Sequence, residues 1–402
     1  MKRAFTFLIL ILCLSAFMLI SCEKSYSITY ELDGGENNPG NPNTYDVDDI
    51  INLGFAKKDG YMFAGWYIDS NFTVSVTEIN CGEGDITLYA KWIPCEEIFN
   101  FDKEADGYTV TIAPDYEIET VIIPSIYNGL PITKINAVPL KGEFASVKNV
   151  FVPETVIDIS SAAFVGSGDI VASLEYIGVA PNNDMYKSVD GVLYSKDGTE
   201  LIRYPSGKKD TSYTILDGVI SINKMCFQNC SNLKSVSIPN TVTEIGFNTF
   251  FNCKSLESIS IPDSVTKMDY GIFEGCESLK NVSLSNNTYA IRFGTFYGCT
   301  SLESITIPSN VKSVEIFAFK GCISLKTLVI SEGLTTINSQ AFQGCTSLDT
   351  VVIPKSVTTI KRLAFLDCMN VTVCCEVNIK PDGWEDEWDA EVKNVIWGYK
   401  GE

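Results

Sequence analysis

The residues that could support hydrolysis most directly form a run of carboxylates near the C-terminus. The run consists of Asp382, Glu385, Asp386, Glu387 and Asp389. Two carboxylates at a suitable separation can cleave a glycosidic bond without histidine. These five acids, however, follow one another in a charged segment that is typical of a solvated surface. An extracellular carboxylate-based glycosidase therefore ranks as the third functional hypothesis.

Histidine is absent from the 402-residue chain. Its absence excludes Ser/His/Asp and Cys/His hydrolases, and also zinc or haem sites that depend on histidine ligands. The formal net charge of −20 disfavours nucleic acid, whose binding requires a basic surface that displaces counterions. We therefore expect a protein that is not an enzyme, with no cofactor, no metal and no nucleic-acid partner.

Cysteine is the remaining residue type with reactive potential, and half of the 14 cysteines recur every 23 residues. The recurring set is Cys230, Cys253, Cys276, Cys299, Cys322, Cys345 and Cys368. In stacked coils their Cβ atoms would be about 4.8 Å apart, whereas a disulfide needs about 3.8 Å. We therefore expect buried free thiols in this column. The better disulfide candidates lie outside it: Cys81, Cys95, Cys226, Cys374 and Cys375.

The N-terminus has the organisation of an export signal. Three residues, Met-Lys-Arg, precede an apolar run from Ala4 to Ile20 that is short for a membrane span. The sequence Leu-Ile-Ser-Cys at 19–22 resembles the lipobox of bacterial lipoproteins. This resemblance implies a signal peptide over 1–21, a linker over 22–25 and lipidation of Cys22, which would anchor the protein to a membrane with two acyl chains. An ordinary secretory signal or an uncleaved anchor are the alternatives, and each places the body outside the cytoplasm.

Residues 26–94 consist of short alternating runs that are separated by Gly, Asn and Pro, which predicts strands and turns. An early Asp-Gly-Gly, then GYMFAGWY at 60–67, then ITLYAKW at 86–92 resemble the B-repeat of internalins. The resemblance implies a compact β-grasp-like domain that serves as a spacer or an interaction unit. Trp66, Tyr67 and Trp92 are expected in its core, with a sugar-stacking platform as the alternative.

A 23-residue period dominates residues 213–370 and predicts stacked coils that share one core. The column that runs in step with cysteine is Phe227, Phe250, Phe273, Phe296, Phe319, Phe342 and Phe365. The unit L-x-x-[VI]-x-I-P reads as a short strand that proline terminates. This pattern resembles the leucine-rich repeat of BspA-like bacterial surface proteins. It gives a mainly β fold: a leucine-rich-repeat solenoid of parallel strands, preceded by the small β-grasp-like domain.

The segments on either side of the regular repeats are less periodic. Residues 95–212 contain divergent leading repeats, with a β-hairpin whose turn is Lys196-Asp197-Gly198. Residues 371–402, which include Trp384, Trp388 and Trp397, depart from the period and are expected to form a polar C-terminal cap.

Two sets of outward positions are expected on the repeat strands. The first alternates in sign and predicts a charge ladder that stabilises the register: Lys234, Glu257, Lys280, Glu303, Lys326 and Asp349. The second is the candidate binding face: Ser235, Ser237, Ser258, Ser260, Asn281, Ser283, Ser304, Thr306, Thr327 and Thr350. Because this face lacks aromatic anchors, it predicts weak or multivalent contacts, with a solvated non-binding face as the alternative.

The N-terminal export signal and the repeat architecture together favour a lipid-anchored surface adhesin or protein-binding module. The BspA-like resemblance implies a protein ligand, either a host matrix protein or another cell surface. A structural cell-envelope protein or spacer without a dedicated ligand is the second hypothesis. Residues 227–370 contain 11 acidic and 11 basic residues, whereas residues 371–402 contain 8 and 3, so the repeats are neutral and the C-terminal end is acidic.

Overall fold

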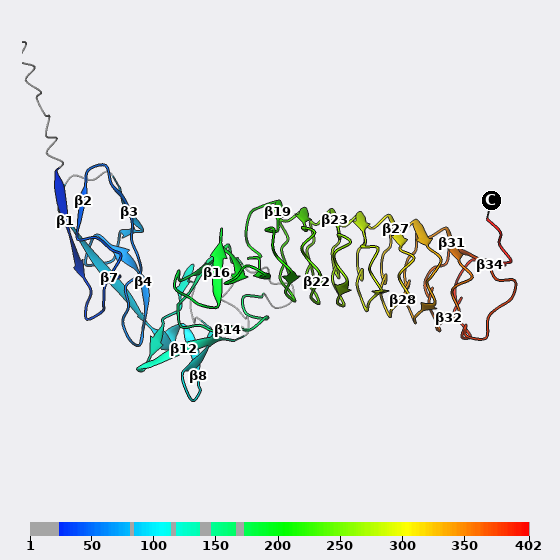
Figure 1. Cartoon of the computed structure of the whole chain (residues 1–402), viewed down its shortest axis with the longest axis horizontal. Coiled ribbons are helices and arrows are strands. Elements are labelled where there is room, and N and C mark those ends of the chain that lie inside the picture. The colour runs from blue at the N-terminus through cyan, green and yellow to red at the C-terminus, as the bar shows by residue number, and fades with distance from the viewer. Residues whose placement is uncertain (1–23, 81–83, 114–117, 137–145, 166–172, 402) are drawn as a thin grey trace, which may run out of the picture. The chain divides into compact units, whose positions relative to one another are not determined.

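The structure is a computed structural model that describes residues 24–80, 84–113, 118–136, 146–165 and 173–401. The described residues fold mainly into short β-strands, as predicted, and Figure 1 shows these strands stacked along the C-terminal half of the chain. None of the described helices is long and apolar enough to cross a membrane. Cys22 and the predicted signal peptide lie outside the described residues. The chain divides into two compact units, which are described separately.

The first unit is a small β domain that contains, among the described residues, 24–56, 65–80 and 84–91. Its main sheet has the order β2-β1-β7-β4-β5, and β3 pairs with β6. The strands are β1 (Ser25–Glu31), β2 (Thr44–Asp46), β3 (Ile50–Asn52), β4 (Tyr61–Tyr67), β5 (Ser75–Val76), β6 (Glu78–Asn80) and β7 (Ile86–Pro94). Trp66 is buried and its indole N–H donates to the Gly54 carbonyl oxygen at 2.9 Å. Tyr67 and Trp92 are half-buried, so only Trp66 is fully enclosed.

The second unit begins with irregular coils. A 3-10 turn, Cys95–Glu97, leads into the antiparallel pair β8 (Phe99–Lys103) and β9 (Tyr108–Ile112). Parallel strands then follow on two sides. One side has β9, β12 (Leu130–Ile135) and β14 (Asp158–Ile159), with β11 (Ile126–Tyr127) as a hairpin partner of β12. The other side has β10 (Thr120–Ile122), β13 (Asn149–Val152) and β15 (Tyr176–Val179).

An antiparallel meander separates these coils from the regular repeats. It comprises β16 (Tyr186–Val189), β17 (Val192–Ser195) and β18 (Glu200–Arg203). The turn at Lys196–Gly198 joins β17 to β18, and β16 adds a third strand to the expected hairpin. Arg203 is almost fully buried, and its guanidinium donates to the carbonyl oxygens of Met225, Cys226 and Ser161. These bonds satisfy a buried charged group and connect the meander to the first regular coil.

The regular repeats form two rows of parallel strands on either side of the core, and we refer to each row as one sheet. We call the first the groove sheet: β19 (Ser212–Thr214), β21 (Ser235–Ser237), β23 (Ser258–Ser260), β25 (Asn281–Ser283), β27 (Ser304–Ile307), β29 (Thr327–Ile330), β31 (Thr350–Ile353), β33 (Thr372–Cys375) and β34 (Asn394–Trp397). The second is the opposite sheet: β20 (Ser221–Ile222), β22 (Glu244–Ile245), β24 (Lys267–Met268), β26 (Ala290–Ile291), β28 (Ser313–Val314), β30 (Thr336–Ile337) and β32 (Thr359–Ile360). The pairing in each row is interrupted once, between β25 and β27 and between β24 and β26. Partners in successive coils are 23 residues apart, as in Ser304↔Thr327 and Thr336↔Thr359.

The turns between the two sheets contain residues in the left-handed backbone conformation. Two positions per coil have positive φ, for example Asn248 (52°) and Asn252 (56°) in one coil and Gly271 (65°) and Gly275 (75°) in the next. Asparagine and glycine tolerate this conformation best. Phe317 occupies the first position with φ of 58°, although an aromatic side chain is disfavoured there.

The C-terminal segment forms a further coil, although its spacing departs from 23 residues. β33 pairs with β31 and β34 pairs with β33 through partners 22 residues apart, and Trp384 forms a parallel bridge with Ile360. Trp388 lies 23 residues after Phe365, and their ring centroids are 6.2 Å apart. Trp384 and Trp388 are buried and close the end of the core.

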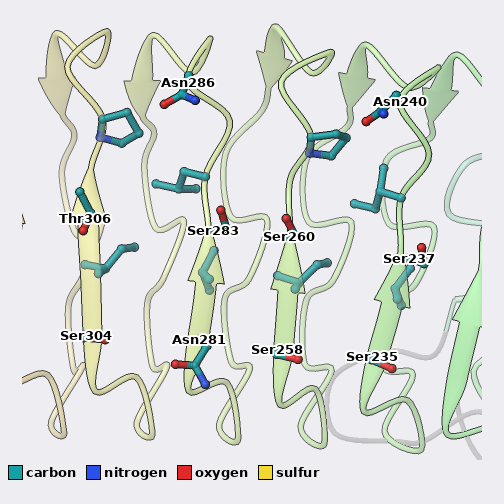
Figure 2. Close-up of a pocket in the computed structure, with 18 of the residues that line it drawn as sticks. Ser235, Ser237, Asn240, Ser258, Ser260, Asn281, Ser283, Asn286, Ser304 and Thr306 are labelled. Atoms are coloured by element: carbon teal, nitrogen blue, oxygen red, sulfur yellow. The ribbon is translucent and has the colours of Figure 1, made fainter.

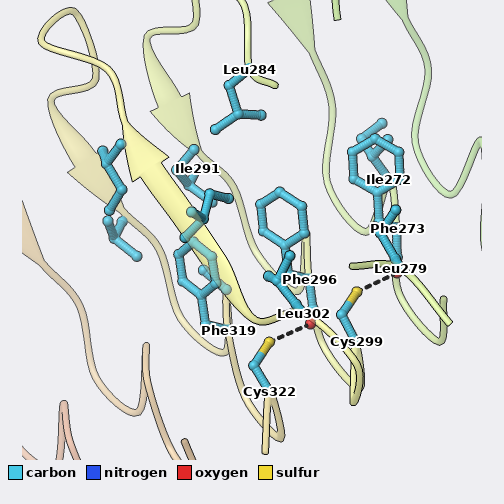
Figure 3. Packing of buried hydrophobic residues seen from close by; sticks show 14 of the residues in the cluster. Ile272, Phe273, Leu279, Leu284, Ile291, Phe296, Cys299, Leu302, Phe319 and Cys322 are labelled. Carbon is cyan, nitrogen blue, oxygen red and sulfur yellow. Dashed lines mark hydrogen bonds between the residues drawn. The ribbon is translucent and has the colours of Figure 1, made fainter. Parts of the chain in front are cut away.

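The core is built from the phenylalanine and cysteine columns. Phe227 to Phe365 are all fully buried, and successive ring centroids are 5.0–5.6 Å apart. Each cysteine from Cys253 to Cys368 donates its thiol to a phenylalanine carbonyl oxygen of the preceding coil, as in Cys299 to Phe273 at 3.1 Å and Cys322 to Phe296 at 3.2 Å (Figure 3). The same carbonyl oxygen also accepts the N–H three residues on. The thiols therefore complete the hydrogen bonding of a buried carbonyl column.

The expected disulfides are not present among the described residues. Cys95, Cys226, Cys374 and Cys375 are buried free thiols, so the prediction for these four is wrong. Cys81 lies outside the described residues. Each of the four fills its own place in the core as a small apolar side chain, and burial raises the pKa of the Cys226 thiol to about 12.

Candidate functional site: a groove of unbonded hydroxyls

A long groove lies along the outer face of the groove sheet. It has a volume of about 1250 Å³ and extends from Ser212 to Ser331. Its floor is formed by alternate strand residues, because the intervening ones point inward; the burial of Ser304–Ile307, for example, alternates from exposed to buried. Figure 2 shows the paired side chains Ser235/Ser237, Ser258/Ser260, Asn281/Ser283 and Ser304/Thr306 on successive strands.

The structure brings nine of the ten predicted face residues together in this groove. All except Thr350 line it; Thr350 lies on β31 of the same sheet, beyond the end of the groove. Ser235 is half-buried and the others are exposed. Asn240, Pro262, Asn286 and Pro308 follow the strands and also line the groove, although the sequence analysis did not select them.

The floor hydroxyls form no hydrogen bonds within the described part of the protein. Hydroxyls beside the opposite sheet behave differently: Thr335 donates to the Lys312 carbonyl oxygen at 2.8 Å, and Thr243 to that of Ile220 at 3.3 Å. Each of these bonds connects residues 23 apart in neighbouring coils. The groove hydroxyls thus retain both donor and acceptor capacity for solvent or a ligand.

The groove is electrically neutral. Among the described residues that line it, none is Asp, Glu, Lys or Arg. Burial of a charge in such a groove would cost free energy without a compensating partner. The groove therefore suits an uncharged surface of a ligand.

The charge ladder lies beside the groove, and it closes only at its first step. Lys234 Nζ and Glu257 Oε1 are 3.1 Å apart, and no other pair of the ladder lies within 4 Å among the described residues. Lys280, Glu303, Lys326 and Asp349 alternate in sign without direct ion pairs. Since both side chains of the closed pair are about half exposed, its contribution to stability is small, about 0–1 kcal/mol.

Sequence reasoning missed an exposed apolar column next to the opposite sheet. Phe247 and Tyr270 stack with ring centroids 5.0 Å apart, and Phe293 and Ile316 continue the column with exposed fractions of 45% and 42%. Their spacing of 23 residues was available in the sequence as a signal. A second, smaller hollow of about 320 Å³ lies at the start of this column and includes Phe247.

Two family models match the chain. Residues 206–293 and 271–380 match the BspA type leucine rich repeat region, with six copies. Residues 26–91 match the Listeria-Bacteroides repeat domain. Both resemblances expected from the sequence are confirmed for these parts of the chain.

The fold agrees with a solved structure, and two further solved structures show weaker similarity. A leucine-rich repeat protein from Eubacterium ventriosum is 27% identical with a TM-score of 0.56, and the match covers 66% of this chain and 67% of that one. A leucine-rich repeat protein from Bacteroides ovatus is 25% identical with a TM-score of 0.47 over 75% and 70%. The pneumococcal vaccine antigen PcpA is 17% identical with a TM-score of 0.42 over 76% and 98%. A comparison with curated proteins finds no match.

Proposed function

We propose that this chain, a BspA-like leucine-rich-repeat protein with a Listeria-Bacteroides-type repeat domain near its N-terminus, is a bacterial cell-surface adhesin without enzymatic activity. Both repeat families are typical of bacterial surface proteins, and a leucine-rich-repeat solenoid suggests a protein-binding or surface protein. The observation that carries the proposal is the neutral groove, whose hydroxyls have no partners within the described residues.

The proposed ligand is a protein of the host matrix or of another cell surface. Each coil offers only small polar side chains, so one coil contributes little affinity. Several equivalent coils that contact one extended surface would add their contributions. The proposed lipid anchor at Cys22 would hold the groove outside the cell.

Solid-phase binding of the full chain to matrix proteins and to bacterial cells tests the adhesin proposal. Ser260→Arg and Ser283→Arg place a bulky cation on the groove floor and should reduce binding at least tenfold. Thr266→Arg is the matched control, because Thr266 is exposed beside the opposite sheet. Saturable binding that all three variants retain would refute the groove as the site, and the absence of binding to any surface would favour the spacer hypothesis.

Acyl labelling of wild type and Cys22→Ala tests the anchor separately. We expect labelled, surface-accessible wild type and an unlabelled variant. An unlabelled wild-type protein that remains inside the cell would contradict the proposed location.

A further inference from the structure

In the turns that follow the opposite sheet, one backbone N–H of each coil donates to a carbonyl oxygen of the next coil. Asn252 N–H donates to the Glu274 carbonyl oxygen of the next coil at 2.8 Å. The equivalent bond recurs in every later coil up to Gly344 N–H and the Leu366 carbonyl oxygen at 2.9 Å. The coil that ends the regular array must therefore find other acceptors for the same N–H groups.

Carboxylates of the C-terminal coil supply these acceptors. Asp367, which is 23 residues after Gly344, donates its N–H to Glu391 Oε2 at 3.1 Å. Arg362 donates its N–H to Glu385 Oε2 at 2.9 Å. At Asp367 a side-chain carboxylate thus replaces the backbone carbonyl oxygen that serves the interior coils. Leu363 keeps a backbone acceptor, the Glu387 carbonyl oxygen at 3.0 Å, and the Arg362 contact has an interior counterpart in Phe293, whose N–H donates to Glu315 Oε2 at 3.0 Å.

Two carboxylates of the C-terminal coil form ion pairs with the coil before it. Glu385 Oε1 lies 2.8 Å from Lys361 Nζ, and Glu387 Oε2 lies 2.6 Å from Arg362 Nη2. On the other side of the coil, Glu376 Oε2 accepts the N–H of Lys355 at 3.2 Å. We call Glu376, Glu385, Glu387 and Glu391 the carboxylate latch.

Several other charged side chains lie near the carboxylate latch. Asp386 pairs with Lys380 within the C-terminal coil at 2.8 Å. The side chain of Asp367, which accepts a bond from Gln343, adds a like charge near Glu391. Asp382, Asp389 and Lys393 complete the charged side chains of this coil between β33 and β34.

We propose that the carboxylate latch makes the C-terminal coil an acid-sensitive cap, which detaches at low pH while the interior coils stay folded. The interior turns that correspond to Asp367 donate to backbone carbonyl oxygens, which do not titrate. The C-terminal coil combines backbone bonds with carboxylate contacts, and the carboxylates lose their charge and their ion pairs when protonated. Detachment uncovers Phe365 and Ile360, which Trp388 and Trp384 now cover.

The direction of the pH effect follows from the contacts. Hydrogen bonds from the Lys361 side chain and then from the Arg362 N–H lower the pKa of Glu385. A group whose pKa is lower in the folded state stabilises that state above its unfolded pKa and loses this effect as the pH falls through the folded value. Since an unperturbed glutamate has a pKa of about 4.3, release is expected below about pH 4.3 and is absent at pH 6.

Hydrogen exchange on the full chain, corrected for intrinsic rates, tests the cap. Between pH 6 and pH 3, amide protection at Arg362 and Asp367 should fall at least tenfold, whereas protection at Phe250 and Asn252 should stay within threefold. The triple variant Glu385→Gln, Glu387→Gln, Glu391→Gln keeps acceptor oxygens that do not titrate, so its protection should no longer depend on pH.

Glu277→Gln is the matched control, because Glu277 forms an ion pair with Lys254 at 3.0 Å inside the array. It should show the same pH dependence as the parent. If the triple variant is unprotected already at pH 6, Glu385→Gln alone should remove the pH dependence at Arg362. Equal protection of the parent at both pH values, or an unchanged pH dependence in the glutamine variants, would overturn the proposal.

Discussion

The two sheets of the solenoid use the same kinds of residue in opposite ways. Beside the opposite sheet, threonine hydroxyls such as those of Thr335 and Thr243 bond to carbonyl oxygens of the neighbouring coil. On the groove sheet, the described serine and threonine hydroxyls bond to nothing within the protein, and the lining residues are uncharged. Beside the opposite sheet the hydroxyls connect neighbouring coils, whereas on the groove sheet they remain accessible to solvent or a ligand. The difference shows that residue type alone does not separate a structural hydroxyl from a binding one.

Truncation of the shared core should have the largest effect, because both sheets rest on it. Phe296 is fully buried, with ring centroids 5.5 Å from Phe273 and 5.1 Å from Phe319. Phe296→Ala should destabilise the solenoid by about 3–5 kcal/mol, measured by urea unfolding with circular dichroism. The exposed Phe293→Ala is the control and should change stability by less than about 1 kcal/mol. A similar small effect for both variants would mean that the two sheets do not share one sealed core.

A matched pair of threonines tests the comparison directly. Thr249 is fully buried and its hydroxyl donates to the Gly246 carbonyl oxygen at 2.6 Å, whereas Thr306 is exposed in the groove. Thr249→Val should cost about 1–2 kcal/mol, because it removes a buried hydrogen bond. Thr306→Val should stay within about 0.5 kcal/mol in the same unfolding experiment. A larger loss at Thr306 would show that the groove hydroxyls contribute to folding after all.

The smallest effects are expected from ion pairs, and they should be equal on the two faces. Glu257 pairs with Lys234 beside the groove at 3.1 Å, and Glu244 pairs with Lys267 on the opposite sheet at 2.9 Å. Glu257→Gln and Glu244→Gln should each change stability by about 0–0.5 kcal/mol, less at high salt. A loss above 1 kcal/mol for only one of them would reveal that charge supports the two sheets unequally.

The sequence predicted the periodic parts of this fold because inward positions recur in register. The columns from Phe227 and Cys230 onward fix which side of each strand faces the core, and the described structure buries both. The strand residues of the groove were predicted, but its border was not, because Asn240, Pro262, Asn286 and Pro308 lie after the strands, outside the alternating pattern. Asn248 and Gly271 are residue types that favour the left-handed conformation of these turns. Phe317 adopts the same conformation, although phenylalanine disfavours it.

Two errors have a common physical cause. The last coil lacks the leucine and cysteine of the repeat, so its Trp388, 23 residues after Phe365, was not recognised as a member of the phenylalanine column. The disulfides were expected because the protein has an export signal and many cysteines. Cys374 and Cys375, however, are neighbours on one strand, and both are buried as free thiols. In both cases the packing of the core, and not the composition of the segment, determines where the side chain lies.

The hydrogen bonds between the turns of neighbouring coils have a consequence for how such a molecule can change size over evolutionary time. Each interior coil accepts hydrogen bonds from the coil before it and donates the equivalent bonds to the coil after it. A duplicated stretch of 23 codons can therefore be inserted without a new type of contact between coils. The C-terminal coil differs, because it lacks the cysteine of the repeat and accepts the Asp367 N–H through the Glu391 carboxylate. Gene duplication can therefore lengthen the array from within, ahead of this coil.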